Sequence, residues 1–416
     1  MALSQRSPVT TASSPVRRRL VIGTVILMAF GYGLQMYAMV PAFGSIAEEY
    51  GLGLTQISLL VSAFFLGYAL AHIPAGFAAA AFGYKLVAVA GSALLAGSSL
   101  MGAVADGYVL FLLSRLIGGM SMSIIVGSAI PLAAAWAKKR QVNLVVGGLV
   151  NGLGFTSGAA VGLYVWVALL DLVGWRMGIG LAAAIGLVVT VVAVSALRVP
   201  ADVPELGGGH FSWRGTFACL RSRSIWAIGI GSVAAYGILF TVSQLGPDYA
   251  EAELGFSASM AGLLSVVLLL LGIPGAFIGG VLGDRSARFL PTLWVPAAVV
   301  VVLLALLPFA GATSVWLVQA GIGLVGMMYF APCTVSPGEY PDEVATNDFG
   351  TALGLILTLG NAGAIAFPYI YAVTAEHAGK SVGWWVLTGI AGLATTAFFL
   401  AREPRRRAVI GSQGAS

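Results

Sequence analysis

One charged side chain in this sequence lies where a charge is costly. Arg115 belongs to the apolar stretch from Tyr108 to Ala135. This stretch is long enough to cross a bilayer, and at a rise of about 1.5 Å per residue Arg115 lies about 10 Å past its start. A charge at such a depth usually faces a cavity or a partner. The chemistry that this side chain could perform is therefore the binding of a negatively charged group.

Carboxylates that could balance Arg115 are missing from the middle of every apolar stretch. Asp106, Asp171 and Asp248 fall near predicted outer ends, and Asp348 falls near an inner one. Proton coupling and the recognition of a cationic drug both commonly use a carboxylate inside the membrane. We therefore expect an anionic or zwitterionic solute, whose negative charge could bind the guanidinium of Arg115.

Other polar side chains are placed so that they could line a solute pathway. Tyr32 and Gln35 lie three residues apart in the first apolar stretch, and Tyr236 and Gln244 share one stripe of the seventh. The remaining candidates are Asn151, Gln319 and Asn361. For each of them a hydrogen bond between helices is the alternative. His72, near the inner end of the second stretch, could carry a proton or form a structural hydrogen bond.

The composition indicates what positions these residues. The chain has 416 residues, of which 59% are hydrophobic and 9% are charged, whereas soluble proteins have about 25% charged residues. This composition is typical of a polytopic membrane protein. Two cysteines offer neither a disulfide framework nor metal-ligand spacing. We expect no metal, no cofactor and no nucleic-acid partner, because the net charge of +5 comes from loops and tails.

Twelve spans follow from the apolar stretches. They run near residues 20–44, 55–79, 86–105, 108–135, 142–168, 174–197, 224–249, 258–282, 289–310, 314–337, 348–373 and 382–401. A re-entrant glycine-rich segment would reduce the count to ten or eleven. Residues 199–223 are polar, basic and rich in Pro and Gly, which predicts a linker. The expected organisation is a tail at 1–19, a six-helix bundle at 20–198, this linker, a second bundle at 224–401 and a tail at 402–416.

The basic residues predict the orientation. If both termini are cytoplasmic, all but three of the 21 Lys and Arg residues lie on that side, and the exceptions are Arg115, Arg176 and Lys380. This distribution satisfies the positive-inside rule. Trp384 and Trp385, near the end of a span, are predicted to anchor the membrane interface.

The two halves of the chain are alike at a shift of about 204 residues. Tyr32 falls on Tyr236, Gly51 falls on Gly255, and the order of spans and loops matches throughout. Internal repeats that meet at a midplane site are typical of secondary transporters.

A short motif follows the eighth span, at Gly279-Gly280-Val281-Leu282-Gly283-Asp284-Arg285-Ser286-Ala287-Arg288. It resembles the loop motif of the major facilitator superfamily, and this resemblance implies a gating role for Gly280, Asp284, Arg285 and Arg288. The counterpart in the first half keeps Gly76, Gly83 and Lys85 but has Ala80 at the acidic position. We therefore expect a weakened charge latch in the first half, with Lys85 as its basic member.

Two further spans resemble the same superfamily. The fourth carries Arg115-x-x-Gly118-Gly119, where the family has Gln before the last Gly and where its Arg borders the central cavity or ties helices together. Arg115 could therefore bind substrate, satisfy carbonyls of neighbouring helices, or reach the outer interface. In the fifth span Gly154, Gly158 and Gly162 form a small-residue face. The proline of the drug-antiporter motif is missing there.

The resemblance implies an all-α membrane protein of two pseudo-symmetric six-helix bundles that works by alternating access, as a symporter or an antiporter. We expect it to move a small organic solute, an anionic or zwitterionic metabolite, across a prokaryotic plasma (inner) membrane. Efflux of lipophilic compounds is the alternative. No histidine is placed to serve a nucleophile, so we expect no enzymatic activity. The expected partners are the solute, the bilayer and a coupling proton or counter-substrate, and we expect a monomer.

Overall fold

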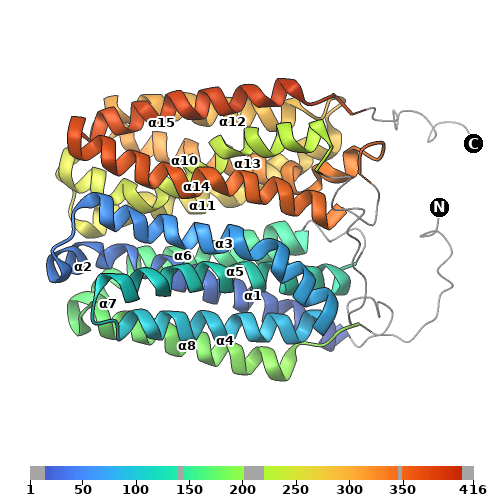
Figure 1. The fold of residues 1–416 in the computed structure, drawn as a ribbon, viewed down its shortest axis with the longest axis horizontal. Coiled ribbons are helices and arrows are strands. Elements are labelled where there is room, and N and C mark those ends of the chain that lie inside the picture. The colour runs from blue at the N-terminus through green and yellow to red at the C-terminus, as the bar shows by residue number, and fades with distance from the viewer. Residues whose placement is uncertain (1–14, 139–143, 201–219, 345–348, 405–416) are drawn as a thin grey trace, which may run out of the picture.

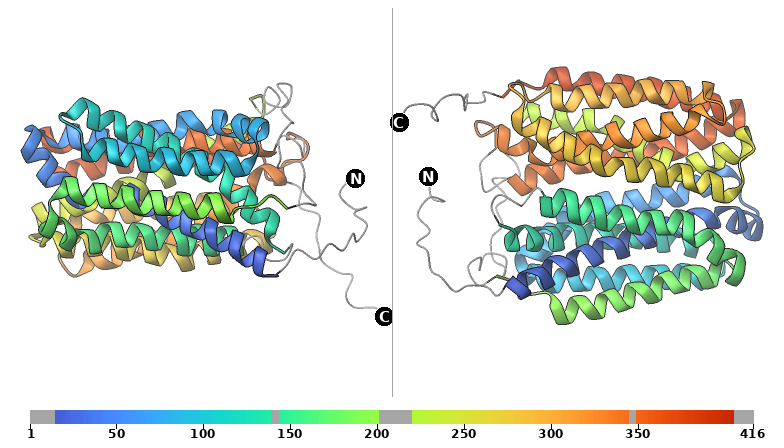
Figure 2. Two further views of the ribbon diagram at one scale, coloured as in Figure 1. Left: turned by 90° about the horizontal axis from the view of Figure 1, so that it is seen from below. Right: turned by 180° about the vertical axis from the view of Figure 1, so that it is seen from behind.

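The computed structural model describes residues 15–138, 144–200, 220–344 and 349–404. All regular secondary structure within these ranges is helical. Twelve helical segments are long and apolar enough to cross a membrane. The predicted all-α class and the count of twelve spans are confirmed. Figures 1 and 2 show the helices running along one axis in two groups, the first half of the chain in one group and the second half in the other.

The first group contains the spans of the N-terminal half. Its helices are α1 (Pro15–Tyr37), η1 (Val40–Ala42), α2 (Phe43–Tyr50), α3 (Leu54–Phe82), α4 (Tyr84–Ala103), α5 (Tyr108–Trp136), η3 (Leu144–Phe155), α6 (Thr156–Ala160), η4 (Val161–Val165), α7 (Trp166–Val173) and α8 (Trp175–Ala196). The segments from α1 to α2 form one span, and those from η3 to α7 form the fifth.

The second group contains the spans of the C-terminal half. Its helices are α10 (Arg223–Leu254), α11 (Ala258–Arg285), α12 (Pro291–Leu306), η6 (Leu307–Phe309), α13 (Ser314–Val335), η7 (Ser336–Glu339), α14 (Phe349–Ala378), α15 (Lys380–Thr395) and η9 (Thr396–Leu400). The predicted linker falls mainly on residues 201–219, which lie outside the described residues.

Several predicted boundaries differ from the structure. Helix α1 begins at Pro15 rather than near Leu20, so the predicted tail at 1–19 overlaps its first turns. Helix α14 continues to Ala378 rather than ending near residue 373. Hydropathy marks only the apolar part of a helix, whereas backbone hydrogen bonds extend it into the polar interface.

The interface role predicted for Trp384 is wrong. This side chain is fully buried, and its ring centroid lies 4.0 Å from that of Tyr371. Its neighbour Trp385 is 44% exposed. The position of a Trp near a span end does not reveal which face of the helix it occupies.

Close helix crossings repeat between the halves. A Cβ atom built on Gly119 of α5 would lie 1.7 Å from the carbonyl oxygen of Phe64, and one on Gly323 of α13 would lie 1.7 Å from that of Leu268. Both residues of the second pair follow those of the first by 204 positions, which is the shift found in the sequence. The backbones therefore touch at equivalent places in the two bundles, as expected of a structural repeat.

The same repeat governs two turns. Helices α2 and α10 end at Gly51 and Gly255, whose φ angles are 64° and 68°. This left-handed conformation disfavours a side chain, which explains glycine at both positions.

The fifth span confirms its predicted small-residue face. Its first part, η3, is π-helical, and Gly158 lies so close to α1 that a Cβ would be 2.1 Å from the carbonyl oxygen of Phe30. Gly154 and Gly162 also face α1.

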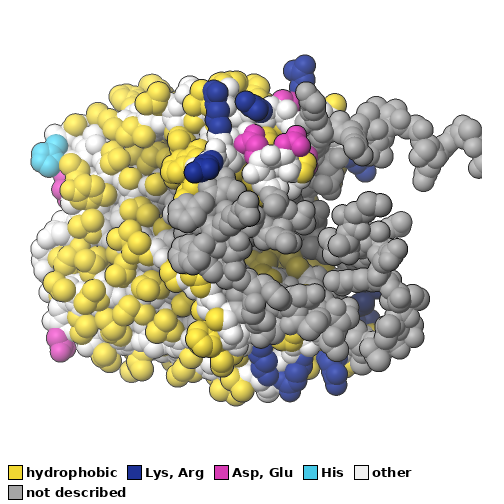
Figure 3. Space-filling model, turned by 45° about the vertical axis from the view of Figure 1, so that its right-hand side comes forward, with side chains coloured by type: hydrophobic (Ala, Val, Ile, Leu, Met, Phe, Trp, Pro, Cys, Tyr) yellow, Lys and Arg dark blue, Asp and Glu magenta, His cyan; other side chains and the backbone are white. Residues whose placement is uncertain are grey.

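The two ends of the molecule differ in charge. The first and last described residues lie at one end, here named the terminal end, and the opposite end is named the distal end (Figures 1 and 2). Hydrophobic side chains cover much of the visible surface between the ends, and Lys and Arg gather toward the terminal end (Figure 3). An apolar belt with charged margins fits a bilayer.

Candidate functional site

The two bundles meet along two helix pairs. Helix α3 packs against α14, and α11 packs against the fifth span. Gly262 of α11 lies against the carbonyl oxygen of Leu163, and Gly148 of η3 lies against the ring of Phe277. In proteins built from two repeats, the solute site lies at the interface of the repeats.

Hydrogen bonds join the bundles in the distal half. The carboxylate of Glu376, at the end of α14, accepts from the backbone N–H of Thr55 at 2.7 Å and from its hydroxyl at 2.5 Å. Deeper in the protein, the hydroxyls of Tyr37 on α1 and Ser243 on α10 lie 2.8 Å apart. These contacts close the interface toward the distal end. We name the pair Thr55–Glu376 the distal latch.

Aromatic rings fill the middle of the interface. The ring centroids of Phe65 on α3 and Phe240 on α10 lie 4.6 Å apart across the two bundles. Tyr236 lies beside Phe240 and packs on Phe330 of α13 at 4.5 Å. Tyr32 belongs to the same hydrophobic core as Phe65 and Tyr236, and Tyr68 packs against this core. We name these side chains the aromatic cluster, comprising Tyr32, Phe65, Tyr68, Tyr236, Phe240 and Phe330.

The cluster includes the pseudo-symmetric tyrosines singled out in the sequence. Tyr32 also donates a hydrogen bond of 3.4 Å to the amide oxygen of Asn151 in the fifth span. The structure therefore brings Tyr32 and Asn151 into contact, and it places Tyr236 beside Phe240, which meets Phe65 of the other bundle. Their phenol and amide groups can bind a polar solute.

Arg115 lies on α5 inside the N-terminal bundle, against α3. Its side chain is 4% exposed, its Nε donates to the carbonyl oxygen of Leu60 at 3.4 Å, and its guanidinium lies 4.4 Å from the ring centre of Phe64. One terminal guanidinium nitrogen, Nη2, has no hydrogen-bond partner. The cation forms no ion pair among the described residues. Its charge is therefore only partly compensated.

A small cavity lined by polar and apolar residues adjoins Arg115. Its volume is about 10 Å³, which is room for about one water. Gln35 lines it together with Ser98, Ser99 and Ser114. The Gln35 amide accepts from Ser99 at 2.8 Å and donates to the carbonyl of Gly31 at 3.3 Å. Gln35 therefore belongs to the surroundings of Arg115.

Three predicted amides are buried in the C-terminal bundle. Neither polar atom of the Gln244 amide has a hydrogen-bond partner, and the oxygens of Gln319 and Asn361 also have none. Asn361 donates to the carbonyl of Leu357 at 2.7 Å. Gln319 lies beside Gly246 of α10. No described hydrogen bond joins these amides to Tyr32 or Arg115.

The predicted gating residues lie at the terminal end. Arg285 ends α11, and Arg288 follows it in the loop, with both side chains exposed. Gly280 lies inside α11, and Lys85 lies in the first turn of α4. The side chain of Asp284 lies outside the described residues. Their gating role stays a prediction.

Sequence reasoning missed partners that only the fold brings together. Nδ1 of His72 forms a short hydrogen bond with the hydroxyl of Ser123 on α5. Ser243, Thr55 and Glu376 were likewise not selected. Serine and threonine are common within spans, so residue type alone gave no signal. The glycine at position 53, before a helix, was a weak sign of a close approach, since a Cβ there would lie 3.0 Å from Glu376.

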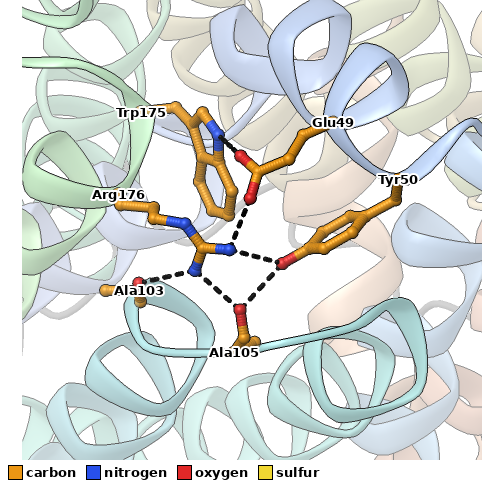
Figure 4. A network of polar contacts seen from close by, with 6 residues as sticks. All are labelled: Glu49, Tyr50, Ala103, Ala105, Trp175 and Arg176. Carbon is orange, nitrogen blue, oxygen red and sulfur yellow. Dashed lines mark hydrogen bonds and ion pairs between the residues drawn. The ribbon is translucent and has the colours of Figure 1, made fainter.

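A second network fastens the distal end of the N-terminal bundle (Figure 4). Arg176 pairs with Glu49 at 2.6 Å and donates to the carbonyl oxygen of Ala105 at 2.6 Å. Trp175 donates to the same carboxylate at 2.7 Å. These bonds connect the end of the first span, the loop after α4 and the start of α8, so they hold this bundle together as one unit.

The described residues offer no metal centre, because no three His, Cys, Asp or Glu side chains cluster among them. Two repeated helix bundles with polar side chains at their interface define the class of secondary transport proteins.

A comparison with protein families identifies the family. Residues 25–368 match the model of the Major Facilitator Superfamily, and the chain belongs to this superfamily. It is thus a multi-pass membrane protein of a transporter family.

Two curated relatives are similar along much of the chain. The Hexuronate transporter of Bacillus subtilis (strain 168) is 27% identical over 407 residues, covering 90% of this chain and 92% of that protein. The "Probable sulfoacetate transporter SauU" of Cupriavidus necator is 25% identical over 290 residues, covering 64% of this chain and 65% of that protein.

Solved structures show the same fold. Two crystal structures of a bacterial homolog of the human lysosomal transporter Spinster, both inward-facing, cover 93% of this chain and 97% of theirs. The unoccupied form has a TM-score of 0.72 at 14% identity, and the occupied form 0.73 at 15%.

Proposed function

We propose that this transporter moves a small organic solute, an anionic or zwitterionic metabolite, by alternating access between its two bundles. The observation that carries the proposal is Arg115, a cation that is 4% exposed, has an unpartnered nitrogen and forms no ion pair among the described residues.

The physical argument concerns uncompensated charge. Burying an ion costs several kcal/mol, and a single carbonyl with one ring face offsets only part of that cost. In a low-dielectric interior the remaining positive potential reaches beyond direct contact. Phe64 covers the guanidinium of Arg115, and its ring centroid lies 5.8 Å from that of Phe65 in the aromatic cluster. A solute in the cluster would therefore lie in a positive field.

The direct contacts would come from neutral donors. Phenols and amides donate hydrogen bonds to an oxyanion without a charge of their own. We assign this role to Tyr32 and Tyr236 of the aromatic cluster and to Asn151, which accepts from Tyr32. The amides of Gln244, Gln319 and Asn361 would reach a solute in the cluster only after a rearrangement of the bundles.

The relatives support an anion. Hexuronate and sulfoacetate, which appear in the names of the two similar proteins, are both anions at neutral pH. The alternative function is efflux of lipophilic compounds, which the rings of Phe65, Phe240 and Phe330 favour. Raised tolerance of a drug-sensitive host on expression of the protein would support that alternative.

We also propose the predicted orientation and domain limits. The terminal end, where Lys and Arg gather, would face the cytoplasm of a prokaryotic cell, in accord with the positive-inside rule. The bundles would be joined by the basic segment at 199–223.

Counterflow in proteoliposomes tests the proposal. We expect the wild type to exchange labelled galacturonate or sulfoacetate, and Arg115→Gln to lose at least about tenfold in rate, which corresponds to about 1.4 kcal/mol. Arg115→Lys should retain part of the activity because it keeps the charge but not the planar fork. Lys138→Gln, which removes an exposed charge, is the matched control. Unchanged transport by a folded Arg115→Gln protein would contradict the role of this residue.

A further inference from the structure

His72 is a half-buried histidine whose surroundings the proposed function does not use. It lies about 27 Å along α3 from Leu54, by the helical rise. One ring nitrogen, Nδ1, bonds the hydroxyl of Ser123, and the other, Nε2, is buried without a hydrogen-bond partner. When Nδ1–H donates to Ser123, Nε2 carries a free lone pair.

The imidazole is connected to the solute region. Its ring lies 4.4 Å from the ring of Tyr68 in an edge-on arrangement. Tyr68 belongs to the aromatic cluster and packs against the core that contains Tyr32 and Tyr236 from the two bundles. A charge on His72 would therefore act on a solute held by the cluster.

Few charged or titratable groups are at the depth of His72. On α5, Arg115 is about 12 Å from Ser123 along the helix axis, toward the distal end. The distal latch places the end of α14 beside the beginning of α3. The titratable groups in the described part of α14 therefore lie toward the distal end, away from His72, and they are Tyr369, Tyr371, Glu376 and His377. On α4, Tyr84 and Lys85 lie at the terminal end. From α10, Tyr236 faces the cluster, and on α3 itself Tyr68 is the neighbour.

We propose that His72 binds the proton that accompanies the anionic solute through the membrane. The inference rests on the proposed function and extends it to the coupling ion. Nε2 takes a proton from water when its side of the pathway opens, Ser123 holds the ring through Nδ1, and the proton leaves to water on the opposite side.

Charge balance explains the coupling. An imidazolium buried in a low-dielectric region is costly, and so is a buried anion. Each therefore stabilises the other, and by linkage the anion favours the proton as much as the proton favours the anion. Arg115 cannot take this part because its guanidinium stays protonated. A singly charged anion would move with one proton, and no net charge would cross the membrane.

Separate measurements of exchange and accumulation test the proposal, with labelled galacturonate and sulfoacetate as probes. With one pH unit across proteoliposomes, alkaline inside, the wild type should accumulate its probe up to about tenfold. His72→Gln should lose this accumulation but should still exchange the probe in counterflow without a gradient, at a higher probe concentration for half-maximal rate, because the stabilisation by the imidazolium is gone. His377→Gln, which changes an exposed histidine, should behave as the wild type.

Two results would overturn the assignment. Accumulation by His72→Gln equal to that of the wild type would remove His72 from coupling, and wild-type counterflow without gradient-driven accumulation would remove the proton itself. Wild-type protein that exchanges neither probe would instead count against the proposed solute class.

A readout without solute keeps the assignment testable in that case. Spin labels at Asp106→Cys and Ala312→Cys report the distance between the distal loops of the two bundles, where both positions are exposed. The background substitution Cys219→Ser removes a native cysteine that would also take up the label. Between about pH 8 and about pH 5.5 the wild-type distance distribution should shift, because protonation favours a conformation that hydrates His72. The distribution of His72→Gln should stay unchanged, and an equal shift in this variant would contradict the proposal.

Discussion

Single side chains determine the electrostatics of this interior because few charges occur there. Arg115 has a carbonyl and a ring as partners where most buried arginines have a carboxylate, and this difference makes it a source of positive potential. Glu343 shows the opposite case at the terminal end. Its carboxylate accepts from the hydroxyls of Ser222 at 2.5 Å and Ser224 at 2.7 Å, at the beginning of α10.

The stability contributed by Glu343 should depend on pH. Burial raises the pKa of this carboxyl, but the hydrogen bonds from Ser222 and Ser224 and the charge on Arg402 outweigh burial and hold the pKa below its ordinary value. A carboxyl with a lowered folded-state pKa stabilises the fold above its unfolded pKa, and the stabilisation is lost as the pH falls through the folded value. Glu343→Gln should therefore cost about 1 kcal/mol at pH near 7 and almost nothing once the pH is below the folded-state pKa of this carboxyl.

Unfolding temperatures of detergent-solubilised protein across this pH range would check the prediction. Asp342→Asn, a change at the exposed neighbouring residue, is the control. A difference between Glu343→Gln and wild type that is the same at both ends of the range would show that the carboxylate charge is not responsible.

Helix pairs in this protein approach until their backbones touch, and glycine makes the approach possible. Gly119 against Phe64 and Gly323 against Leu268 are the equivalent crossings of the two bundles. In lipid, close packing of this kind replaces the hydrophobic driving force that joins helices in water.

Alanine at either crossing should destabilise the protein. Gly119→Ala and Gly323→Ala place a methyl group inside the van der Waals radius of a backbone carbonyl, so the helices must separate, at a cost of about 1–3 kcal/mol or more. Gly97→Ala is the matched control, because nothing lies within 4 Å of a Cβ at Gly97 on α4. The yield of monodisperse protein and its unfolding temperature measure the effect. Equal stability of Gly119→Ala and Gly97→Ala would show that the crossing is looser than described.

The whole molecule is a pair of bundles held together by few polar contacts. Within the described residues, the distal latch and the bond between Tyr37 and Ser243 join helices of opposite bundles. The proposed alternating access would require such contacts to break on opening of the distal end. The network around Arg176 lies within one bundle and need not change (Figure 4).

Removing the distal latch should shift the conformational equilibrium. Glu376→Gln weakens two hydrogen bonds to Thr55, and Thr55→Ala removes the one made by the hydroxyl. A loss of about 1 kcal/mol changes the ratio of closed to open molecules about fivefold. Spin labels at positions 106 and 312 should then report a larger population with long distances between the distal ends. Glu253→Gln, at an exposed position on α10, should leave the distribution unchanged. The same distribution in Glu376→Gln and wild type would contradict the latch.

The sequence predicted those features of the fold that a single residue type determines, such as apolar spans and glycine turns. Hydropathy predicted twelve spans, and the shift of 204 residues predicted the repeat that Gly51 and Gly255 display in their left-handed turns. Boundaries such as the start of α1 at Pro15 were missed, because helical hydrogen bonding continues outside the apolar stretch.

The candidate site was harder to predict because its contacts join distant residues. The spacing of Tyr32 and Tyr236 suggested a shared pathway, but nothing in the sequence linked His72 to Ser123 or Thr55 to Glu376. Gln35 was predicted to line the pathway, whereas the structure places it beside Arg115 within one bundle, and its role in binding stays a prediction. Which face a side chain occupies depends on how neighbouring helices pack, and a single helix does not specify this.

Ligand-induced stabilisation of the purified protein tests the central claim most directly, because binding precedes transport in either direction and with any coupling ion. The panel would contain galacturonate, sulfoacetate, a zwitterionic amino acid and a lipophilic cation. At about 100 times its dissociation constant a ligand adds about 2.7 kcal/mol of stability, so we expect a clear rise in unfolding temperature with the anions, and its loss in Arg115→Gln. Stabilisation by the lipophilic cation alone, unchanged in Arg115→Gln, would contradict the account and favour efflux.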